Sequence, residues 1–347
     1  MIRAAVLTKI GAPLEVMEDI AVPDLRAGQV LVKLAYSGVC HSQVMEASGG
    51  RGPDRWLPHM LGHEATGRVI STGPEVTKVA SGDLVVLGWI KGMGFEAGGC
   101  HYPHGDFTIN AGGVTTFSDH AVVSENRLVP LPEGVPLDLG VLFGCVLPTG
   151  AGLVLNELQP EAGCTVAVFG LGGIGLAALM AARTYDVRLI AVDISKEKLD
   201  LARDLGADHI INAAEEDPLA RIRDIAAPGS EYCVECSGLT SVIEQAFLAS
   251  HPQKGLTIFA SHPKVGEKIA LDPHHLISGR RIQGSWGGGS DPDRDVPRMA
   301  ELWRDGKLPL ERLISPRRYR LDEVNEALDD LRFGRALRPV IELNGDV

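Results

Sequence analysis

The chain is 347 residues long, 45% hydrophobic and 22% charged, with a formal net charge of −12. A single core usually stops growing at about 250–300 residues, so this length predicts two domains. The acidic balance excludes the basic footprint that nucleic acid or an anionic membrane requires, and a small-molecule partner is expected instead.

The N-terminal segment and the cysteines indicate the compartment. The start, MIRAAVLTKIGAP, lacks the apolar stretch and small-residue cleavage site of a signal peptide. No run reaches the roughly 20 apolar residues that span a bilayer, so no membrane association is expected. Six scattered cysteines are too few for a disulfide framework in a chain this long. We therefore expect a cytoplasmic protein whose cysteines are buried thiols or metal ligands.

The first 130 residues predict a β-rich domain. Residues 29–36 (QVLVKLAY) and 67–72 alternate apolar and polar positions, and Gly82 and Asp83 open a further apolar run. Residues 88–114 form a glycine-rich insertion that is long for a connection inside a compact domain, which indicates either function or mobility.

From Cys164 onward, apolar strands alternate with helices. The pairs are CTVAVF with GGIGLAALMAARTY, RLIAVDI with SKEKLDLARDLG, and EYCVEC with TSVIEQAFLAS, followed by GLTIFAS. Repeated strand–helix units predict a parallel, doubly wound sheet of the Rossmann type, hence an α/β fold. After Gly289 the pattern changes to helices at 296–305 and 322–332 and a strand at 339–343. This tail has no core of its own, so we expect it to pack on the first domain.

The motif GLGGIG at 170–175 matches G-x-G-x-x-G. It follows an apolar strand and opens a helix, the context in which glycines let backbone amides approach a pyrophosphate. Asp193 ends the next strand, where a carboxylate accepts hydrogen bonds from an adenosine ribose and repels a 2′-phosphate, which favours NAD over NADP. The predicted cofactor-binding residues here are Gly170, Gly172, Gly173, Ile174, Gly175 and Asp193. A structural turn that binds nothing is the alternative.

Three residues far apart in the sequence offer ligands to a metal. Cys40 lies in SGVCHSQ, His63 in LGHEATG and Cys145 in GCVLPTG. Together they form the Cys₂His set of a catalytic zinc, which keeps a fourth position open, and two thiolates neutralise Zn²⁺. Taken singly, a cysteine is usually a small buried hydrophobe, and spacing alone does not decide between these interpretations.

The motifs GVCHS, GHE, GCVLPTG, GLGGIG and VDIS stand in the order of the zinc-dependent medium-chain alcohol dehydrogenases, which the chain resembles over essentially its whole length. The resemblance implies a GroES-like catalytic domain at 1–148 and 290–347 and a Rossmann NAD-binding domain at 149–289. It implies hydride transfer between NAD and a primary or secondary alcohol, with an aldehyde or ketone as the other substrate form. It also implies one catalytic zinc per chain and a homo-oligomer, dimer or tetramer, paired through residues 280–286.

Position by position, the resemblance assigns roles to site residues. Cys40, His63 and Cys145 fall on the zinc ligands, Glu64 on a nearby carboxylate, and Ser42 on the hydroxyl that accepts the alcohol's proton. His41 and Arg338 fall on contacts to the cofactor pyrophosphate, Thr149 on a residue packing the nicotinamide, and Trp89 on an aromatic wall of the substrate pocket.

Two positions depart from the family. Gln43 replaces an aspartate that accepts the ring N–H of the ligand histidine. A Gln carbonyl can accept that bond without adding charge, so Gln43→Asp is expected to raise zinc affinity by up to about 10–100-fold. The four cysteines of the family's structural zinc are reduced to one in 88–114, so that site cannot form. A different metal site is conceivable, although adjacent ligands chelate poorly, at Cys100, His101, His104 and Asp106.

The substrate and the activity keep alternatives at this stage. Six basic residues could border the pocket and favour an anionic or polyhydroxy alcohol, or be scattered solvated charges; these are Arg51, Arg55, His59, Lys91, His101 and His104. The alternative functions are a zinc-free NAD(P)-dependent reductase of the same superfamily and a non-catalytic nucleotide-binding protein.

Overall fold

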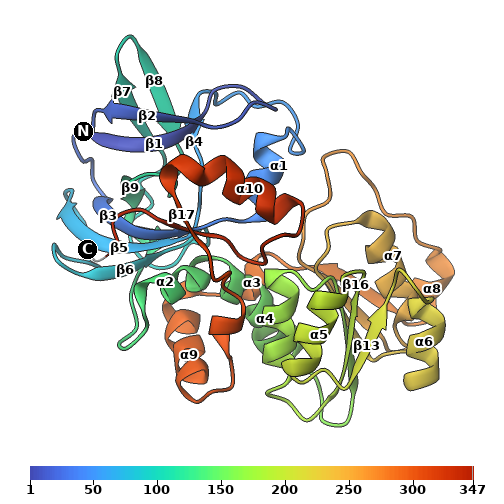
Figure 1. The fold of residues 1–347 in the computed structure, drawn as a ribbon. Coiled ribbons are helices and arrows are strands. Elements are labelled where there is room, and N and C mark those ends of the chain that lie inside the picture. The colour runs from blue at the N-terminus through green and yellow to red at the C-terminus, as the bar shows by residue number, and fades with distance from the viewer. Residues whose placement is uncertain (346) are drawn as a thin grey trace. The chain divides into compact units, whose positions relative to one another are not determined.

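The computed structural model describes residues 1–345 and 347 (Figure 1). The chain divides into two compact units. Unit 1 comprises Met1–Cys145, Asp291–Ala300 and Leu310–Val347, and unit 2 comprises Val146–Ser290 and Glu301–Pro309. The residues that follow position 290 therefore contribute mainly to unit 1.

Unit 1 contains two mostly antiparallel sheets. The five-stranded sheet has the order β2-β1-β4-β8-β7, with β1 (Ile2–Leu7), β2 (Glu15–Ile20), β4 (His59–Met60), β7 (Cys100–His104) and β8 (Phe107–Ala111). The seven-stranded sheet has the order β10-β6-β5-β3-β18-β17, and β9 also pairs with β3. Its strands are β3 (Gln29–Gly38), β5 (Ala65–Thr72), β6 (Leu84–Leu87), β9 (His120–Ser124), β10 (Leu128–Pro130), β17 (Arg318–Arg320) and β18 (Val340–Glu342).

The glycine-rich stretch 88–114 contains a hairpin, β7 paired with β8. Cys100 and Tyr102 point into the core with Ile109, and the Tyr102 hydroxyl accepts the N–H of Val122 at 2.7 Å. Gly105 adopts φ +56° in the connecting turn, a conformation that glycine reaches without strain. Residues 100–111 of the expected insertion therefore form a hairpin within a sheet.

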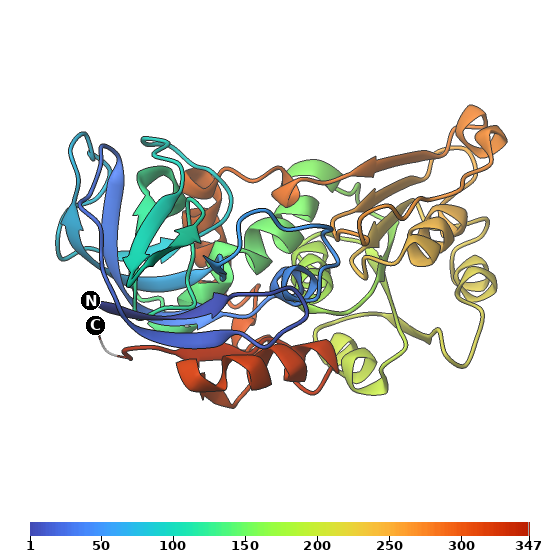
Figure 2. The ribbon, with the colours of Figure 1, turned by 90° about the horizontal axis from the view of Figure 1, so that it is seen from above.

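The helices of unit 1 are short. They are α1 (His41–Ala47), α2 (Leu137–Gly140), α10 (Val324–Arg332) and the N-terminal part of α9 (Pro292–Arg304), with 3₁₀ turns η1 (Glu125–Arg127), η2 (Val141–Gly144), η5 (Leu310–Arg312) and η6 (Leu321–Glu323). Figures 1 and 2 both show α10, in red, beside the N-terminal strands. Its buried face, which includes Val324 and Leu328, packs in one core with Leu7 and Phe117.

Helix α9 begins at Pro292, four residues earlier than the sequence predicts. Proline lacks an N–H, but the first turn of a helix does not need one. The carboxylate of Asp291 accepts the N–H of Asp293 at 3.1 Å, which supplies a partner to the free helix end. The expected start at Val296 is therefore wrong by one turn.

Unit 2 is a six-stranded sheet in which all adjacent strands are parallel. The order is β13-β12-β11-β14-β15-β16, which is the doubly wound order of two βαβ halves. The strands are β11 (Thr165–Phe169), β12 (Arg188–Asp193), β13 (His209–Asn212), β14 (Tyr232–Glu235), β15 (Leu256–Phe259) and β16 (Arg281–Gly284). This arrangement confirms the predicted fold class.

The helices of unit 2 cover the parallel sheet. They are α3 (Val146–Gly152), the π-helical η3 (Leu153–Leu158), α4 (Gly173–Ala182), α5 (Lys196–Asp204), α6 (Pro218–Ile225), α7 (Thr240–Ala249), α8 (Pro273–Ile277) and the 3₁₀ turn η4 (Gly287–Gly289). Over the described part of the chain, no single helix is long and apolar enough to cross a membrane, although the bent pair Leu137–Gly144 and Val146–Leu158 passes the length and composition test together.

Candidate metal centre and dinucleotide site

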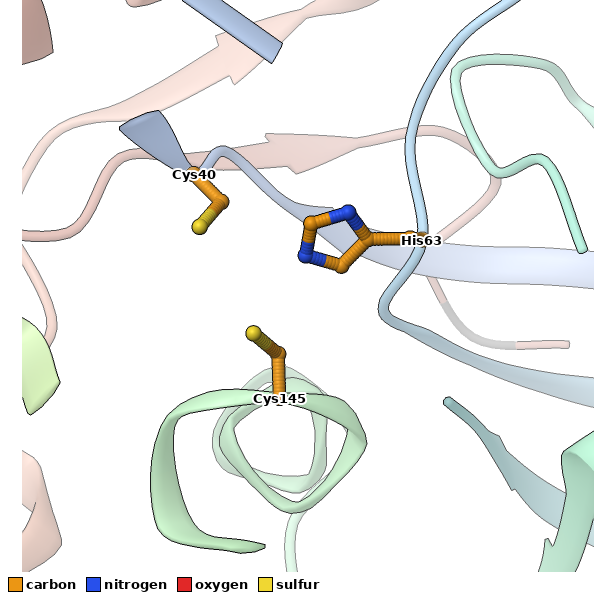
Figure 3. Close-up of side chains that lie close together, drawn as sticks. All are labelled: Cys40, His63 and Cys145. Atoms are coloured by element: carbon orange, nitrogen blue, oxygen red, sulfur yellow. The ribbon is translucent and has the colours of Figure 1, made fainter. Parts of the chain in front are cut away.

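Cys40, His63 and Cys145 come together in unit 1. One ligand atom from each residue lies within 4.8 Å of the other two. Figure 3 shows the two sulfur atoms and one ring nitrogen facing the same space. The three residues predicted as metal ligands are therefore adjacent in the fold, although their sequence positions are far apart.

Each ligand lies in a short connection between two elements. Cys40 is the residue before α1 and has extended backbone angles. His63 follows Gly62, whose φ of +91° and close approach to Phe117 leave no room for a side chain. Cys145 occupies the break between η2 and α3, with φ −149° and ψ −62°. Short turns therefore aim all three side chains at one point.

Glu64 organises the turns on either side of the cluster. A Cβ on Gly38, two residues before Cys40, would lie 2.3 Å from the Glu64 carboxylate. A Cβ on Gly144, directly before Cys145, would lie 2.8 Å from the Glu64 Cβ. Both glycines are required for this packing, and the sequence analysis missed them. Their signal is a glycine within two positions of each ligand cysteine.

The Glu64 carboxylate forms a buried ion pair with the guanidinium of Arg338. Burial raises the pKa of Glu64, and the Arg338 charge opposes that rise. Burial alone would lower the pKa of Arg338, but the negative charge of Glu64, followed by that of Cys40, raises it. The pair therefore carries two compensating charges directly beside the thiols.

The two thiols differ in acidity. A hydrogen bond from Cys145 and the positive charge of Arg338 hold the pKa of Cys40 well below its usual range, against the effect of burial. The same hydrogen bond to Cys40, together with burial, raises the pKa of Cys145 well above its usual range. The Cys40–Cys145 pair therefore loses one proton readily. The second thiol proton is released when a metal dication binds the two sulfur atoms.

The donor set fits zinc. The Nε2 atom of His63 is buried and has no hydrogen-bond partner among the described residues. None of the six cysteines forms a disulfide, so both sulfur atoms of the cluster are free. Two thiolates and one imidazole are the ligands of a catalytic zinc with an open fourth position. With the Glu64–Arg338 pair neutral, this ion would also complete a neutral site.

Gln43 is oriented differently from the sequence expectation. Its Oε1 accepts the N–H of Cys40 at 3.0 Å, and its Nε2 lies 2.5 Å from Nδ1 of His63. The expected bond from the ring N–H to the Gln43 carbonyl is therefore not formed. Ser42 also faces the ring, with its Oγ 3.3 Å from the same Nδ1.

In unit 2 the glycine motif has the shape that a dinucleotide needs. Gly170 adopts φ +83° and packs on Ser237, and a Cβ on Gly175 would lie 1.9 Å from the Gly170 carbonyl oxygen. A Cβ on Gly172 would meet no atom within 4 Å. The first and last glycines are thus needed for the turn and its packing. Gly172 leaves open space where a pyrophosphate can approach the backbone.

The remaining predicted cofactor residues surround this turn or lie elsewhere. Gly173 and Ile174 form the start of α4, beyond Gly172. Asp193 accepts the N–H of Leu171 at 2.6 Å and therefore braces the turn from the end of β12. The Thr149 hydroxyl is buried without a hydrogen-bond partner among the described residues.

Two residues of unit 1 also have predicted roles. His41 is the exposed first residue of α1, next to Cys40. Trp89 is half-buried, and Gly88 before it packs on Gly144, which places Trp89 near the Cys145 turn.

The conceivable second metal site does not form. Cys100 is buried in the core, where burial raises its pKa to about 11, and His101 on the same strand is exposed. A different group, Glu46, Asp54 and His59, has ligand atoms within 4.8 Å of one another. Both ring nitrogens of His59 already have partners, however, namely Asp54 at 2.8 Å and the Met60 carbonyl at 3.0 Å.

Two family models and curated relatives match the chain. The family model described as alcohol dehydrogenase GroES-like domain matches residues 26–133, and the one described as zinc-binding dehydrogenase matches residues 173–304. S-(hydroxymethyl)glutathione dehydrogenase from Escherichia coli is 33% identical over 98% of this chain and 99% of its own length.

Solved structures are similar over nearly the whole chain. Benzyl alcohol dehydrogenase from Acinetobacter calcoaceticus is 30% identical, with a TM-score of 0.88 and 99% coverage of both chains. An alcohol dehydrogenase zinc-binding domain protein from Burkholderia ambifaria is 32% identical, with a TM-score of 0.86, over 99% of this chain and 98% of its own.

The fold and the two sites define a metal-dependent oxidoreductase that uses a dinucleotide. The chain belongs to the zinc-dependent medium-chain alcohol dehydrogenase family. It is an NAD-dependent enzyme that acts on the CH–OH group of alcohols, and zinc and NAD are its cofactors. The zinc-free and non-catalytic alternatives have no support in the comparisons.

Proposed function

We propose that the enzyme interconverts an uncharged primary or secondary alcohol and its aldehyde or ketone, with zinc held by Cys40, His63 and Cys145. The observation that carries this proposal is the convergence of the three ligand atoms, together with the lack of a hydrogen-bond partner for Nε2 of His63 among the described residues. When bound, zinc supplies Lewis-acid chemistry that acidifies an alcohol and polarises a carbonyl.

The residues of the chain prepare this chemistry. Cys40 and Cys145 supply two negative charges, and the Arg338–Glu64 pair keeps a further carboxylate neutralised next to them. The Ser42 hydroxyl stands beside His63, where it accepts the proton that the alcohol releases and passes its own proton outward. His41 and Arg338 are proposed contacts for the cofactor pyrophosphate, and Trp89 is a proposed wall of the substrate pocket.

Residues of unit 2 bind NAD in this proposal. The backbone at Gly172 and Gly173 binds the pyrophosphate at the start of α4, with Gly170, Ile174 and Gly175 shaping the turn. Asp193 accepts hydrogen bonds from the adenosine ribose, and its charge disfavours a 2′-phosphate. Thr149 packs on the nicotinamide. In this proposal the catalytic domain comprises residues 1–148 and 290–347, and the NAD-binding domain comprises residues 149–289.

An uncharged substrate is favoured because several basic residues already have acidic partners. Arg51 pairs with Glu46, His59 with Asp54, and Lys91 with Glu96. His101 is bound to Asn110, and Arg55 stacks on Trp56. These partners satisfy most of the charges that an anionic alcohol would otherwise recruit. The relative named for benzyl alcohol is consistent with an uncharged alcohol, whereas the relative named for S-(hydroxymethyl)glutathione acts on a substrate that carries carboxylates.

The enzyme is proposed to be a cytoplasmic homo-oligomer, a dimer or a tetramer. Strand β16 is the edge of the parallel sheet, and three of its four residues are exposed. Ile277, in the preceding helix α8, is 83% exposed. Among the described strands the outer edge of β16 has no partner, and such an edge near an apolar side chain suits pairing with the same strand of a second copy.

The test combines metal analysis with turnover. We expect about one zinc per chain by elemental analysis and NADH formation with neutral primary or secondary alcohols. Cys145→Ser should lose the zinc and the turnover together, because a serine hydroxyl is a poor zinc ligand. Cys164→Ser, at a cysteine outside the cluster, is the matched control and should retain both. Turnover that persists without zinc would contradict the proposal, as would a strong preference for a phosphorylated alcohol.

A further inference from the structure

The side-chain amide of Gln43 contacts two groups, the backbone N–H of Cys40 and the ring of His63. A backbone N–H can only donate, so the Gln43 atom 3.0 Å from the Cys40 nitrogen must be the carbonyl oxygen. The amide NH₂ group then faces Nδ1 of His63 at 2.5 Å. Gln43 is 2% exposed, which leaves little access for water to change this assignment.

This arrangement selects a tautomer of His63 in the metal-free chain. Because the Gln43 NH₂ donates to Nδ1, the neutral ring carries its proton on Nε2. Coordination of a metal through Nε2 requires the opposite tautomer, in which Nδ1 carries the proton and needs an acceptor. Zinc binding therefore turns Nδ1 into a second donor that faces the Gln43 NH₂ group.

Two groups could accept a hydrogen bond from the N–H at Nδ1, namely the Gln43 carbonyl and the Ser42 hydroxyl. If the Gln43 amide rotated, its carbonyl could accept from Nδ1, but the Cys40 N–H would lose its acceptor, since Gln43 provides the one described for it. An unpaired buried N–H is costly. The Ser42 hydroxyl already lies 3.3 Å from Nδ1 and can accept a hydrogen bond while every backbone donor here keeps its partner.

We propose that Ser42 is the hydrogen-bond acceptor for the zinc-binding tautomer of His63, and so is a positioning residue for the metal. The inference rests on the proposed zinc ligation by Cys40, His63 and Cys145. It gives the Ser42 hydroxyl a second task beside accepting the proton of the alcohol. Because its oxygen accepts from His63, its own hydrogen points away from the ring.

The test is a double-mutant cycle in zinc affinity. Gln43→Glu keeps the length of the side chain and replaces the amide with a carboxylate, which accepts at both positions. Ser42→Ala should weaken zinc binding by about 10–100-fold in the wild-type background. In the Gln43→Glu background the same change should weaken it by about threefold or less, because the carboxylate accepts from Nδ1 instead. The dissociation constant is measured by competition with a chromogenic chelator.

Two control variants separate the hydrogen bond from other effects. Ser42→Thr keeps the hydroxyl and should retain wild-type zinc affinity. Ser48→Ala removes a hydroxyl at the other end of α1, where it donates to the Met45 carbonyl, and should leave the affinity unchanged. Loss in Ser42→Thr equal to that in Ser42→Ala would overturn the inference.

The other outcomes are also distinct. An equal loss for Ser42→Ala in both backgrounds, or no loss in wild type, overturns the role of Ser42 and leaves the zinc proposal standing. Absence of zinc from the wild-type chain overturns the proposed function and this inference with it. Should Ser42→Ala not fold, ¹⁵N NMR of the wild-type His63 ring replaces it. The proton should move from Nε2 to Nδ1 on addition of zinc, and a ring with Nδ1–H in both states would contradict the inference.

Discussion

Arg338 and Glu64 lie 274 positions apart and form an ion pair in which the two side chains are 4% and 0% exposed. Glu64 contacts the glycines that precede Cys40 and Cys145. The pair therefore links the C-terminal part of unit 1 to both cysteine turns. Its integrity decides whether the metal ligands stay aligned.

Removing one member of this pair should destabilise the chain strongly. Arg338→Leu leaves an isolated buried carboxylate and should lower the free energy of unfolding by about 3–5 kcal/mol. The double variant Glu64→Gln with Arg338→Leu should cost less than the sum of Glu64→Gln and Arg338→Leu made singly, because no buried charge is left alone. Urea denaturation of the metal-free chains measures both values.

A surface pair provides the comparison. Arg203 and Asp200 form an exposed ion pair at 2.8 Å on α5. Arg203→Ala should change the free energy of unfolding by about 1 kcal/mol or less. An Arg338→Leu chain as stable as Arg203→Ala would show that the buried pair does not hold the turns.

Two glycines of the dinucleotide turn should respond in opposite ways. Gly172→Ala adds a methyl group into open space, so the chain should keep its melting temperature while its dissociation constant for NADH rises by at least about tenfold. Gly175→Ala forces a methyl group against the Gly170 carbonyl and should lower the melting temperature by several degrees. Fluorescence titration and thermal denaturation measure the two effects. Normal NADH affinity in Gly172→Ala would place the pyrophosphate elsewhere.

Asp193 should control the choice between NAD and NADP. Asp193→Asn removes the charge that repels a 2′-phosphate, and the preference for NAD in kcat/KM should fall by at least about tenfold. Affinity for NAD should also fall, since the N–H of Leu171 loses its carboxylate. Asp200→Asn removes an equal charge from an exposed position on α5 and should leave the preference unchanged. A preference equally unaffected in Asp193→Asn would remove this residue from the cofactor site.

Glu125 should make stability depend on pH. Its buried carboxylate accepts the N–H groups of Thr77, Lys78 and Phe95 at 2.6–2.7 Å. Burial raises the pKa of Glu125, but the three N–H donors and the Lys78 charge together lower it by more. The pKa of Glu125 is therefore below that of an ordinary glutamate. A lowered pKa stabilises the fold above the unfolded value of about 4.3, and this contribution is lost as the pH falls through the folded pKa.

Glu125→Gln should therefore destabilise the chain by about 2 kcal/mol at pH 7, where charged acceptors are lost. The difference from wild type should stay constant from pH 7 to pH 5 and shrink below about pH 4.3. Urea midpoints across this range measure it, with Glu133→Gln at an exposed position as the control. A difference that grows on acidification would contradict the assigned role.

The parallel sheet was predictable because its central strands are buried on both faces. Every residue of β11, Thr165–Phe169, is buried, and such a strand appears in the sequence as a continuous apolar run before the glycine turn. The metal ligands were found through the order of the family motifs. Spacing alone could not bring Cys40, His63 and Cys145 together, because their meeting depends on two sheets and a helix break.

The remaining features depend on local hydrogen bonds that sequence patterns do not reveal. The carbonyl of Gln43 is taken by the Cys40 N–H, and this local cap decides which amide atom faces His63. Helix α6 begins at Pro218 after Asp217, and it was not predicted because its sequence lacks a clear apolar repeat. Hairpin β7–β8 was hidden by the glycines around it. In each case the deciding contact is a hydrogen bond to the backbone, which composition and periodicity do not report.

The lobe around Glu125 and the β7–β8 hairpin is fastened by a carboxylate and a hydroxyl rather than by a metal cluster of thiolates. A chelator that removes the catalytic zinc therefore removes no bond that holds this lobe. During zinc scarcity such an enzyme would persist as folded, inactive chains, and activity would return on resupply without new protein synthesis. The zinc supply then sets the fraction of chains that are active, while the stability of the fold sets the amount of folded protein.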